Sequence, residues 1–289
     1  MIDALHMMLA EPWARHALLA TLLVATLCST LGVAVVLKRM AFIGQGVSHA
    51  AFGGVGTAAL LGLAGAAQDA VVLVFCIASS LLIGLLSQRR VERDTAIGVL
   101  LVAAMAWGVT ADKLAAILRD AWPWYARWSG QLTPMGFEEV LFGSVLVVPV
   151  SWLWMAAGAT VVLLAVLALT IRPMLFFLFD EHASAVFGVP SKAMHYLLLV
   201  SLAVSIVVTM RVAGVILATA LLVLPAATAL QLCRRWPWVL LWSWLIAMAC
   251  CVAGLWLSLV FGELLPGPTM VLVLSAAFGA AWLAGRGKS

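Results

Sequence analysis

Charged residues are scarce in this sequence, with 16 Lys and Arg and 12 Asp and Glu among 289 residues. Hydrophobic residues make up 65% of the chain, and the mean hydropathy is +1.17. One soluble core could not hide so much apolar surface, so the composition excludes an ordinary soluble domain and predicts a membrane protein. The net charge of +4 is not gathered in a basic domain, which argues against nucleic-acid binding.

Motifs for enzymatic or cofactor chemistry are missing as well. The five cysteines form no C-x-x-C pair and no Cys/His group with zinc-site spacing, so we expect them to pack structurally. The Gly-Lys-Ser at 287–289 is like the end of a phosphate-binding loop, but Trp282 stands where the loop needs its first glycine. The sequence thus predicts neither a nucleotide site nor a cofactor bound by this chain.

Apolar runs long enough to span a bilayer, about 20 residues each, recur along nearly the whole chain. They predict an all-α polytopic protein with eight or nine membrane helices in a single domain over 1–289. Arg211 and Gly214 alone separate two of the runs, so one of these could be a half-helix. The predicted spans are 15–37, 47–65, 69–87, 95–111, 149–171, 195–210, 213–232, 238–260 and 267–284.

The distribution of Lys and Arg predicts the orientation, because short positive loops stay cytoplasmic. The breaks at 38–39, 89–94, 172–195 and 234–235, together with the tail at 286–288, hold 11 of the 16 Lys and Arg but only 4 of the 12 Asp and Glu. We therefore expect a membrane protein with its N-terminus outside and its C-terminus in the cytoplasm.

The segment 112–148 mixes charge with aromatic side chains, including Trp122, Trp124 and Tyr125. By the loop assignment it lies outside, where aromatic rings favour the headgroup layer, so we expect an external interfacial segment. Because apolar and aromatic side chains lie next to Glu138 and Glu139, the segment is also a candidate docking face for a partner protein.

The stretch "RMAFIGQGVSHAAFGGVG" (39–56) places polar side chains at the start of the second predicted span. Gln45 and His49 are spaced i, i+4 and share a helix face, and Ser48 lies beside them. Polar groups are costly in hydrocarbon, which makes them functional candidates, although a hydrogen-bonded packing role for His49 is the competing interpretation. A neighbouring stripe of small residues predicts close approach of another helix; it comprises Gly46, Ala50, Gly54, Ala58 and Gly62.

Six stretches together resemble the membrane subunits of zinc and manganese ABC importers, the family-3 metal permeases. They are the stretch just quoted, "DTAIGVLL", "LFGSVL", "DEHASAVFGV", "GVILATALLVLPAATA" and "GPTMVL", in the family's order and spacing. The resemblance implies an all-helical permease of the vitamin B12 importer type (type II), located in the bacterial plasma (inner) membrane and without catalysis of its own. It also implies three partners: a second permease subunit in a homodimer, a cytoplasmic ABC ATPase and an external metal-binding protein.

The resemblance also implies roles for particular residues. His49, Ser48 and Gln45 would line the translocation path where the second spans of two protomers approach, with Gln45 standing where the family has Asp. The loop 172–195 would couple to the ATPase, through Asp180, Glu181, Ala185, Gly188 and Val189. Because a neutral amide replaces a carboxylate, and zinc accepts imidazole nitrogen more readily than manganese does, we expect Zn²⁺ rather than Mn²⁺ or iron as the transported ion.

Two other interpretations stay open at this point. A permease for metal chelates belongs to the same class, although no set of residues in the chain is an obvious contact for a large ligand. A multi-span membrane protein of another class, such as an intramembrane enzyme or an assembly scaffold, would also have a long apolar sequence with a single polar helix face.

Overall fold

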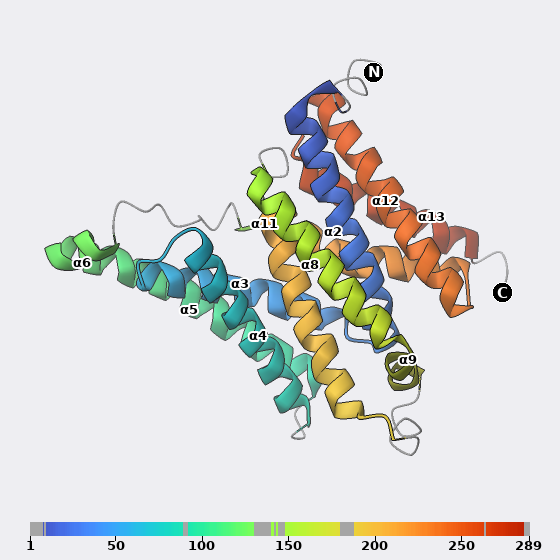
Figure 1. The fold of residues 1–289 in the computed structure, drawn as a ribbon, viewed down its shortest axis with the longest axis horizontal. Coiled ribbons are helices and arrows are strands. Elements are labelled where there is room, and N and C mark those ends of the chain that lie inside the picture. The colour runs from blue at the N-terminus through green and yellow to red at the C-terminus, as the bar shows by residue number, and fades with distance from the viewer. Residues whose placement is uncertain are drawn as a thin grey trace. The chain divides into compact units, whose positions relative to one another are not determined.

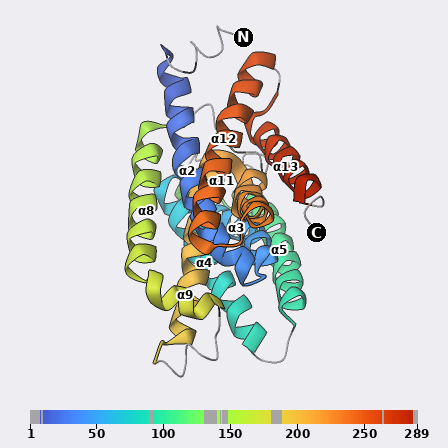
Figure 2. The same cartoon turned by 90° about the vertical axis from the view of Figure 1, so that its right-hand side faces the viewer.

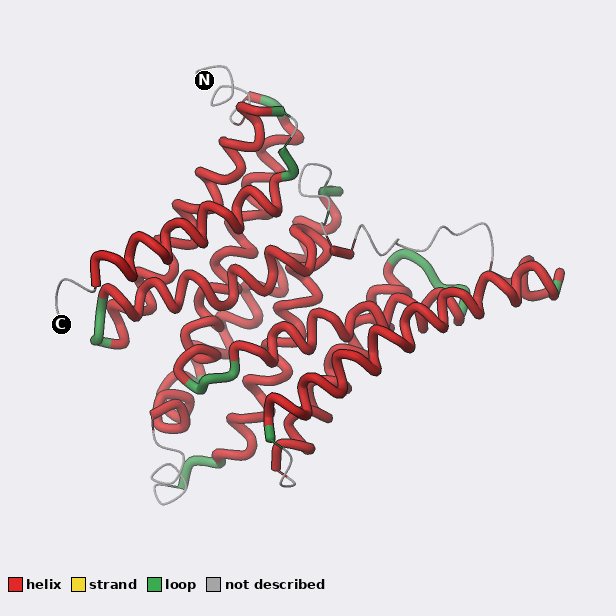
Figure 3. Tube along the Cα trace, turned by 180° about the vertical axis from the view of Figure 1, so that it is seen from behind, coloured by secondary structure: helices red, strands yellow, loops and turns green. Residues whose placement is uncertain are grey.

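The structure is a computed structural model that describes residues 8, 10–88, 92–129, 140–141, 143, 148–179, 188–262 and 264–285. Within these ranges every regular element is an α-helix, as Figure 3 shows. The helices are α2 (Pro12–Leu37), α3 (Ala41–Leu60), α4 (Ala66–Gln88), α5 (Arg93–Ala121), α6 (Pro123–Ser129), α8 (Val150–Leu169), α9 (Ile171–Phe179), α11 (Ser191–Leu232), α12 (Trp236–Phe261) and α13 (Pro266–Gly285).

Seven helices in the described ranges are long and apolar enough to cross a membrane, namely α2, α4, α5, α8, α11, α12 and α13. The predicted runs 195–210 and 213–232 join in α11, which is interrupted at Gly214 by a non-helical φ of 78° and ψ of 166°. The helix α3 has 20 residues, but Gln45, His49 and its glycines lower its hydropathy. The predicted all-α membrane fold is confirmed, and the count of nine spans is approximate.

One compact unit comprises Met1–Ala41, Leu141–Met194 and Val208–Ser289. In this unit α12 packs against both α2 and α13, and α8 packs against α2 (Figures 1 and 2). Cys28, Cys250 and Cys251 lie in its buried core. None of the five cysteines, all of which lie in described ranges, forms a disulfide bond.

The second compact unit comprises Phe42–Val140 and His195–Val207. It holds most of α3, together with α4, α5 and α6, and α4 packs against α5. The hydroxyl of Ser80 on α4 donates to the carbonyl oxygen of Leu199 at 2.9 Å, which ties the first part of α11 to this unit. Each unit thus combines segments that are separated in sequence, and α11 contributes to both.

Helix α5 is longer than the predicted span 95–111, because it continues to Ala121. The prediction ended the helix where charged residues begin, yet "DKLAAILRDA" (112–121) consists largely of strong helix formers. The helix ends at Ala121, because the next residue, Trp122, precedes Pro123, and a residue that precedes proline is disfavoured in helical conformation. The first part of the predicted interfacial segment is therefore a continuation of a spanning helix.

The aromatic side chains at α6 differ in their exposure. Trp122 and Trp124 are exposed, with ring centroids 6.4 Å apart in an edge-on arrangement. Tyr125 is buried, and its hydroxyl donates to the carbonyl oxygen of Leu60 at the end of α3, at 2.6 Å. Glu138 and Glu139, and with them the suggested docking face, lie outside the described residues.

The predicted coupling loop 172–195 is shorter in the structure, because helices occupy both of its ends. The short helix α9 covers Ile171–Phe179, and α11 already begins at Ser191. Proline inside a helix removes a hydrogen bond and clashes with the preceding turn, so Pro173 cannot continue α8 but is tolerated in the first turn of a new helix. Thr170 marks the break between α8 and α9.

Candidate functional site

The polar residues of α3 lie deeper in their helix than predicted. A tight turn joins α2 to α3: Arg39 has a φ of 56°, and the N–H of Met40 donates to the carbonyl oxygen of Val35 at 2.9 Å. Helix α3 therefore begins at Ala41 rather than at 47. As a result Gln45 and His49 lie in its second and third turns, not at its entrance.

Gln45 and His49 share one face of α3, as the i, i+4 spacing predicts. Gln45 is exposed and His49 is half-buried. The imidazole stacks on Phe52, with ring centroids 5.8 Å apart and 17° between the planes. Its Nδ1 is buried, and no described residue forms a hydrogen bond with it. A buried nitrogen without a hydrogen-bond partner is costly, so the position of this atom calls for an explanation beyond packing.

Ser48 does not join this face. Its side chain is fully buried, and its hydroxyl donates to the carbonyl oxygen of Gln45 at 2.9 Å. Successive helical residues are about 100° apart around the axis, so Ser48 lies on the packed side while His49 lies at the edge of the exposed side. The structure thus brings Gln45 and His49 together and places Ser48 against its own backbone.

The small-residue stripe does allow another helix to approach closely, but the helices belong to this chain. A Cβ added at Gly54 would lie 2.8 Å from Cα of Val72 on α4, and one at Gly46 would lie 2.8 Å from Cγ2 of Ile97 on α5. Gly62 lies beyond α3 in a turn, with a φ of 63°. Because α4 and α5 cover the stripe, it does not support the predicted approach of two protomers.

Helices α3 and α5 approach each other more closely still, at a contact that the sequence did not predict. A Cβ at Gly56 would overlap the backbone of Gly108, and one at Gly108 would lie 2.5 Å from the carbonyl oxygen of Phe52. The indole N–H of Trp107 also donates to the hydroxyl of Thr57 at 2.9 Å. Thr57 and Trp107 each place a polar group in an apolar helix, and such groups often form hydrogen bonds between membrane helices. This pattern could have predicted the contact.

Two of the family-like stretches meet in the first compact unit. Gly143 of "LFGSVL" has a φ of 67°, and a Cβ on it would overlap the backbone nitrogen of Gly214, the first residue of "GVILATALLVLPAATA". The kink in α11 is therefore in backbone contact with the segment before α8. Arg211, one turn before this kink, lies over the ring of Trp152, 5.3 Å from its centroid.

Most of the predicted coupling residues cannot be placed. Asp180, Glu181 and Ala185 lie outside the described residues. Gly188 is exposed with a φ of 75°, a conformation that favours glycine, and the carbonyl oxygen of Val189 accepts from the N–H of Ser191 at 2.8 Å. The turn into α11 thus has the left-handed backbone expected at a helix boundary, and the coupling role stays a prediction.

No group of three or more His, Cys, Asp or Glu in the described part of the chain could hold a metal ion. Gln45 and His49 offer two donor groups, fewer than the four to eight ligands that resident ions take. Among the described residues, this face is therefore not a complete site for a resident metal ion. A polytopic, all-helical protein with such a polar face on a membrane helix has the features of a membrane transporter.

The comparisons with known proteins define the family. The model of the ABC 3 transport family matches residues 11–284, so the chain belongs to this family. The predicted resemblance is confirmed. Family membership makes the chain a transport permease rather than an enzyme, and in such systems the ATPase is a separate subunit.

Relatives and a solved structure match over nearly the full length. The manganese transport system membrane protein MntC of Halalkalibacterium halodurans is 31% identical over 279 residues, covering 95% of this chain and 88% of the relative. The chelated iron transport system membrane protein YfeD of Yersinia pestis is 27% identical over 274 residues, covering 93% and 84%. PsaBC from Streptococcus pneumoniae, solved in complex with a Fab, has a similar fold, with a TM-score of 0.79 and 24% identity. The match covers 98% of this chain and 95% of the solved chain.

Proposed function

We propose that this chain is the membrane subunit of an ATP-driven importer of a divalent first-row transition metal ion. The family match over residues 11–284 carries the proposal, and the relatives named for manganese and chelated iron support it. The imidazole of His49 is a suitable transient donor for such ions, because its buried Nδ1 has no hydrogen-bond partner among the described residues.

The side chains of α3 and the names of the relatives support different metals. An imidazole and a neutral amide favour zinc, because manganese prefers charged oxygen ligands. The names of the relatives favour manganese or iron instead. The proposed cargo is therefore an ion of the zinc, manganese and iron group, and zinc is the member that the side chains of α3 favour.

Metal uptake tests this function directly. A strain that lacks the chain is grown in chelated medium and supplied with labelled Zn²⁺, Mn²⁺ or Fe²⁺, with the wild-type gene restored or not. Restoration should increase the uptake of at least one of these ions, and the increase should disappear when the ATPase subunit is inactivated. Equal uptake of all three ions with and without the chain would contradict the proposal.

A metal chelate is a second candidate cargo, because one relative is named for chelated iron transport. Supplying the same metal as a free ion and as a preformed chelate separates the two candidates. Uptake of the free ion alone would support the ion importer, and uptake of the chelate alone would support the chelate importer.

The proposed assembly is a dimer of permease subunits with cytoplasmic ATPase subunits and an external metal-binding protein, as the family resemblance implies. The segment from Asp180 to Val189 would contact the ATPase. Its described end, at Gly188, is exposed, and an added Cβ there would meet no atom within 4 Å.

The orientation of the chain gives a testable prediction. A reporter fused after Ser289 should be cytoplasmic, because 11 of the 16 Lys and Arg lie in the loops on that side. A reporter inserted in the turn between α3 and α4, at 62–65, should be external. Enzymatic activity or labelling of both reporters in whole cells measures their location. An external C-terminus would reverse the loop assignment and with it the cytoplasmic placement of the coupling segment.

A further inference from the structure

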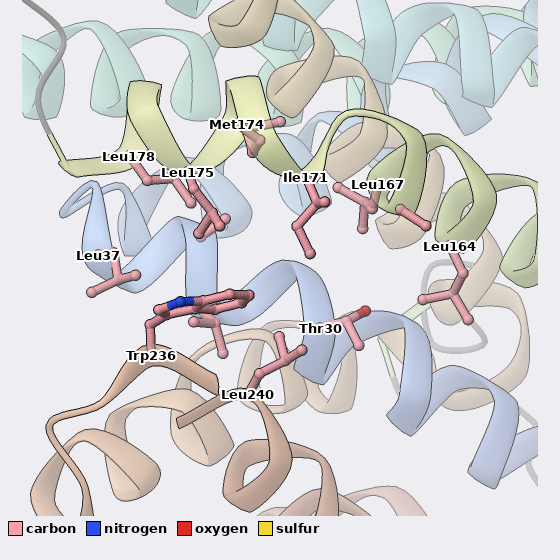
Figure 4. Close-up of a pocket in the computed structure, with 13 residues that line it drawn as sticks. Thr30, Leu37, Leu164, Leu167, Ile171, Met174, Leu175, Leu178, Trp236 and Leu240 are labelled. Carbon is pink, nitrogen blue, oxygen red and sulfur yellow. The ribbon is translucent and has the colours of Figure 1, made fainter. Parts of the chain in front are cut away.

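The first compact unit contains an apolar groove of about 220 Å³ between four of its helices (Figure 4). Figure 4 shows Leu37, Leu178 and Trp236 toward one end of the groove and Thr30 and Leu164 toward the other. Its lining comes from the second half of α2, the end of α8, the short helix α9 and the start of α12.

The lining of this groove suits a hydrocarbon chain. Thr30 and Trp236 are the only lining residues with a side-chain nitrogen or oxygen. The hydroxyl of Thr30 lies 2.9 Å from the carbonyl oxygens of both Thr26 and Leu27, so its proton is directed to its own helix. The volume is below the 300–1,000 Å³ of typical small-molecule sites. Thr30 and Leu37 are two helical turns apart, about 11 Å, so the groove is long as well as narrow.

Three basic residues lie next in sequence to lining residues of the groove, and two of them, Lys38 and Arg235, lie at the end that Leu37 and Trp236 mark. Lys38 follows Leu37, Arg172 follows the lining residue Ile171, and Arg235 precedes Trp236. The ammonium of Lys38 lies 3.8 Å from the ring centroid of Phe177 on α9, while Arg172 and Arg235 are exposed. The acidic residues nearest in sequence, Asp180 and Glu181, belong to the segment proposed to contact the ATPase.

The start of α12 adds a further preference for an anion at this end. Helix α12 has 26 residues, and its N-cap, Arg235, forms no side-chain capping hydrogen bond. Pro237 in the first turn has no N–H, so the attraction of this N-terminus for phosphate comes from the helix dipole and the remaining free N–H groups. Clusters of basic side chains between membrane helices on the cytoplasmic side attract anionic lipid headgroups. The narrow shape of the groove, the basic side chains beside it and the N-terminus of α12 therefore all favour an anionic lipid.

We propose that this groove binds one acyl chain of an anionic phospholipid, whose phosphate lies near Lys38, Arg172 and Arg235 at the start of α12. The site is separate from the Gln45 and His49 face and does not depend on which metal the chain transports. Trp236 fits the arrangement, since tryptophan favours the boundary between headgroups and acyl chains.

Lipid retention tests the headgroup part of the proposal. The full-length chain is reconstituted in nanodiscs of phosphatidylglycerol and phosphatidylcholine, and the lipids that remain bound after release are counted by native mass spectrometry. The wild-type chain should enrich phosphatidylglycerol about tenfold over the supplied ratio. The triple variant Lys38→Gln, Arg172→Gln, Arg235→Gln should lose this enrichment. The matched control Arg15→Gln, at the opposite end of α2, should keep it.

Filling the groove tests the acyl-chain part. Ala168 lines the groove and is exposed, so Ala168→Phe should remove the retained lipid of either type. Ala165 is also exposed on α8 but does not line the groove, so Ala165→Phe should retain it. Equal melting temperatures in lipid-free detergent would show that all variants are folded. Retention of both lipids by the wild-type chain in their supplied ratio would overturn the proposal. The proposal would also be overturned if Ala168→Phe dissociated a dimer of the chain while the bound lipid stayed, because a second copy of the chain would then occupy the groove.

Discussion

His49→Ala is expected to reduce metal uptake to the background of a strain that lacks the chain. The imidazole has a buried Nδ1 with no hydrogen-bond partner among the described residues, and it lies one turn after the exposed Gln45. Removing it deletes a nitrogen donor from the polar face. The stability should change little, since a ring contact such as that with Phe52 contributes about 0.5–1.5 kcal/mol.

The measurement is labelled-metal uptake at matched amounts of protein in the membrane. His16→Ala is a suitable control, because His16 is also half-buried in a spanning helix but lies in the other compact unit. Normal uptake by His49→Ala would make His49 a packing residue, the competing interpretation of its place in the span. Uptake by the control should be unchanged.

A companion variant, Gln45→Asp, tests the metal preference of the same face. An added carboxylate should increase Mn²⁺ uptake relative to Zn²⁺ by about tenfold, the change that 1.4 kcal/mol of ion-binding free energy gives. Gln45→Asn keeps the neutral amide and should leave the ratio unchanged. An unchanged ratio in Gln45→Asp, combined with lost uptake in His49→Ala, would mean that the ion contacts His49 but not position 45.

Gly143→Ala is expected to prevent the chain from folding stably or to abolish transport. An added Cβ would overlap the backbone nitrogen of Gly214 and lie 2.5 Å from the backbone carbon of Ala213. Backbone atoms cannot turn away as a flexible side chain can. Gly143 also has a φ of 67°, and a non-glycine residue in such a region costs on the order of 1–3 kcal/mol before any overlap is counted.

Gly214→Ala should have a similar effect, because the φ of 78° and ψ of 166° at the kink are essentially restricted to glycine. Gly158→Ala is the matched control in the same unit, since a Cβ there meets no atom within 4 Å. Membrane abundance and melting temperature in detergent are the measurements. If Gly143→Ala melts at the same temperature as Gly158→Ala, the contact between Gly143 and Gly214 is not required for stability.

Hydropathy predicted the position of most spanning helices but not where several of them begin and end. A lipid-facing run is recognisable from its composition, as in α12 and α13. Where a helix continues out of the apolar zone, as α5 does to Ala121, its end depends on helix propensity and on Pro123. Where polar residues enter a packed helix, as Gln45 does in α3, the hydropathy profile places the start too late.

The candidate site was predictable in part. The spacing of Gln45 and His49 fixes a shared helix face, and the structure has it. The burial of Ser48 was not predictable, because spacing does not tell which side of α3 meets the neighbouring helices. For the same reason the partners of the glycine stripe could not be identified. The helices that cover Gly46 and Gly54 are α5 and α4 of the same chain. The sequence alone could not tell whether the covering helices would come from this chain or from a second copy.

The contact of α3 with α5 constrains how the second unit can move. The backbone at Gly56 abuts the backbone at Gly108, and Trp107 is hydrogen-bonded to Thr57 across the same seam. Flexible side chains between helices can change rotamer and absorb a small sliding motion, but abutting backbones cannot. We therefore expect α3 and α5 to move together, so that a displacement of α5 would also displace the helix that carries His49.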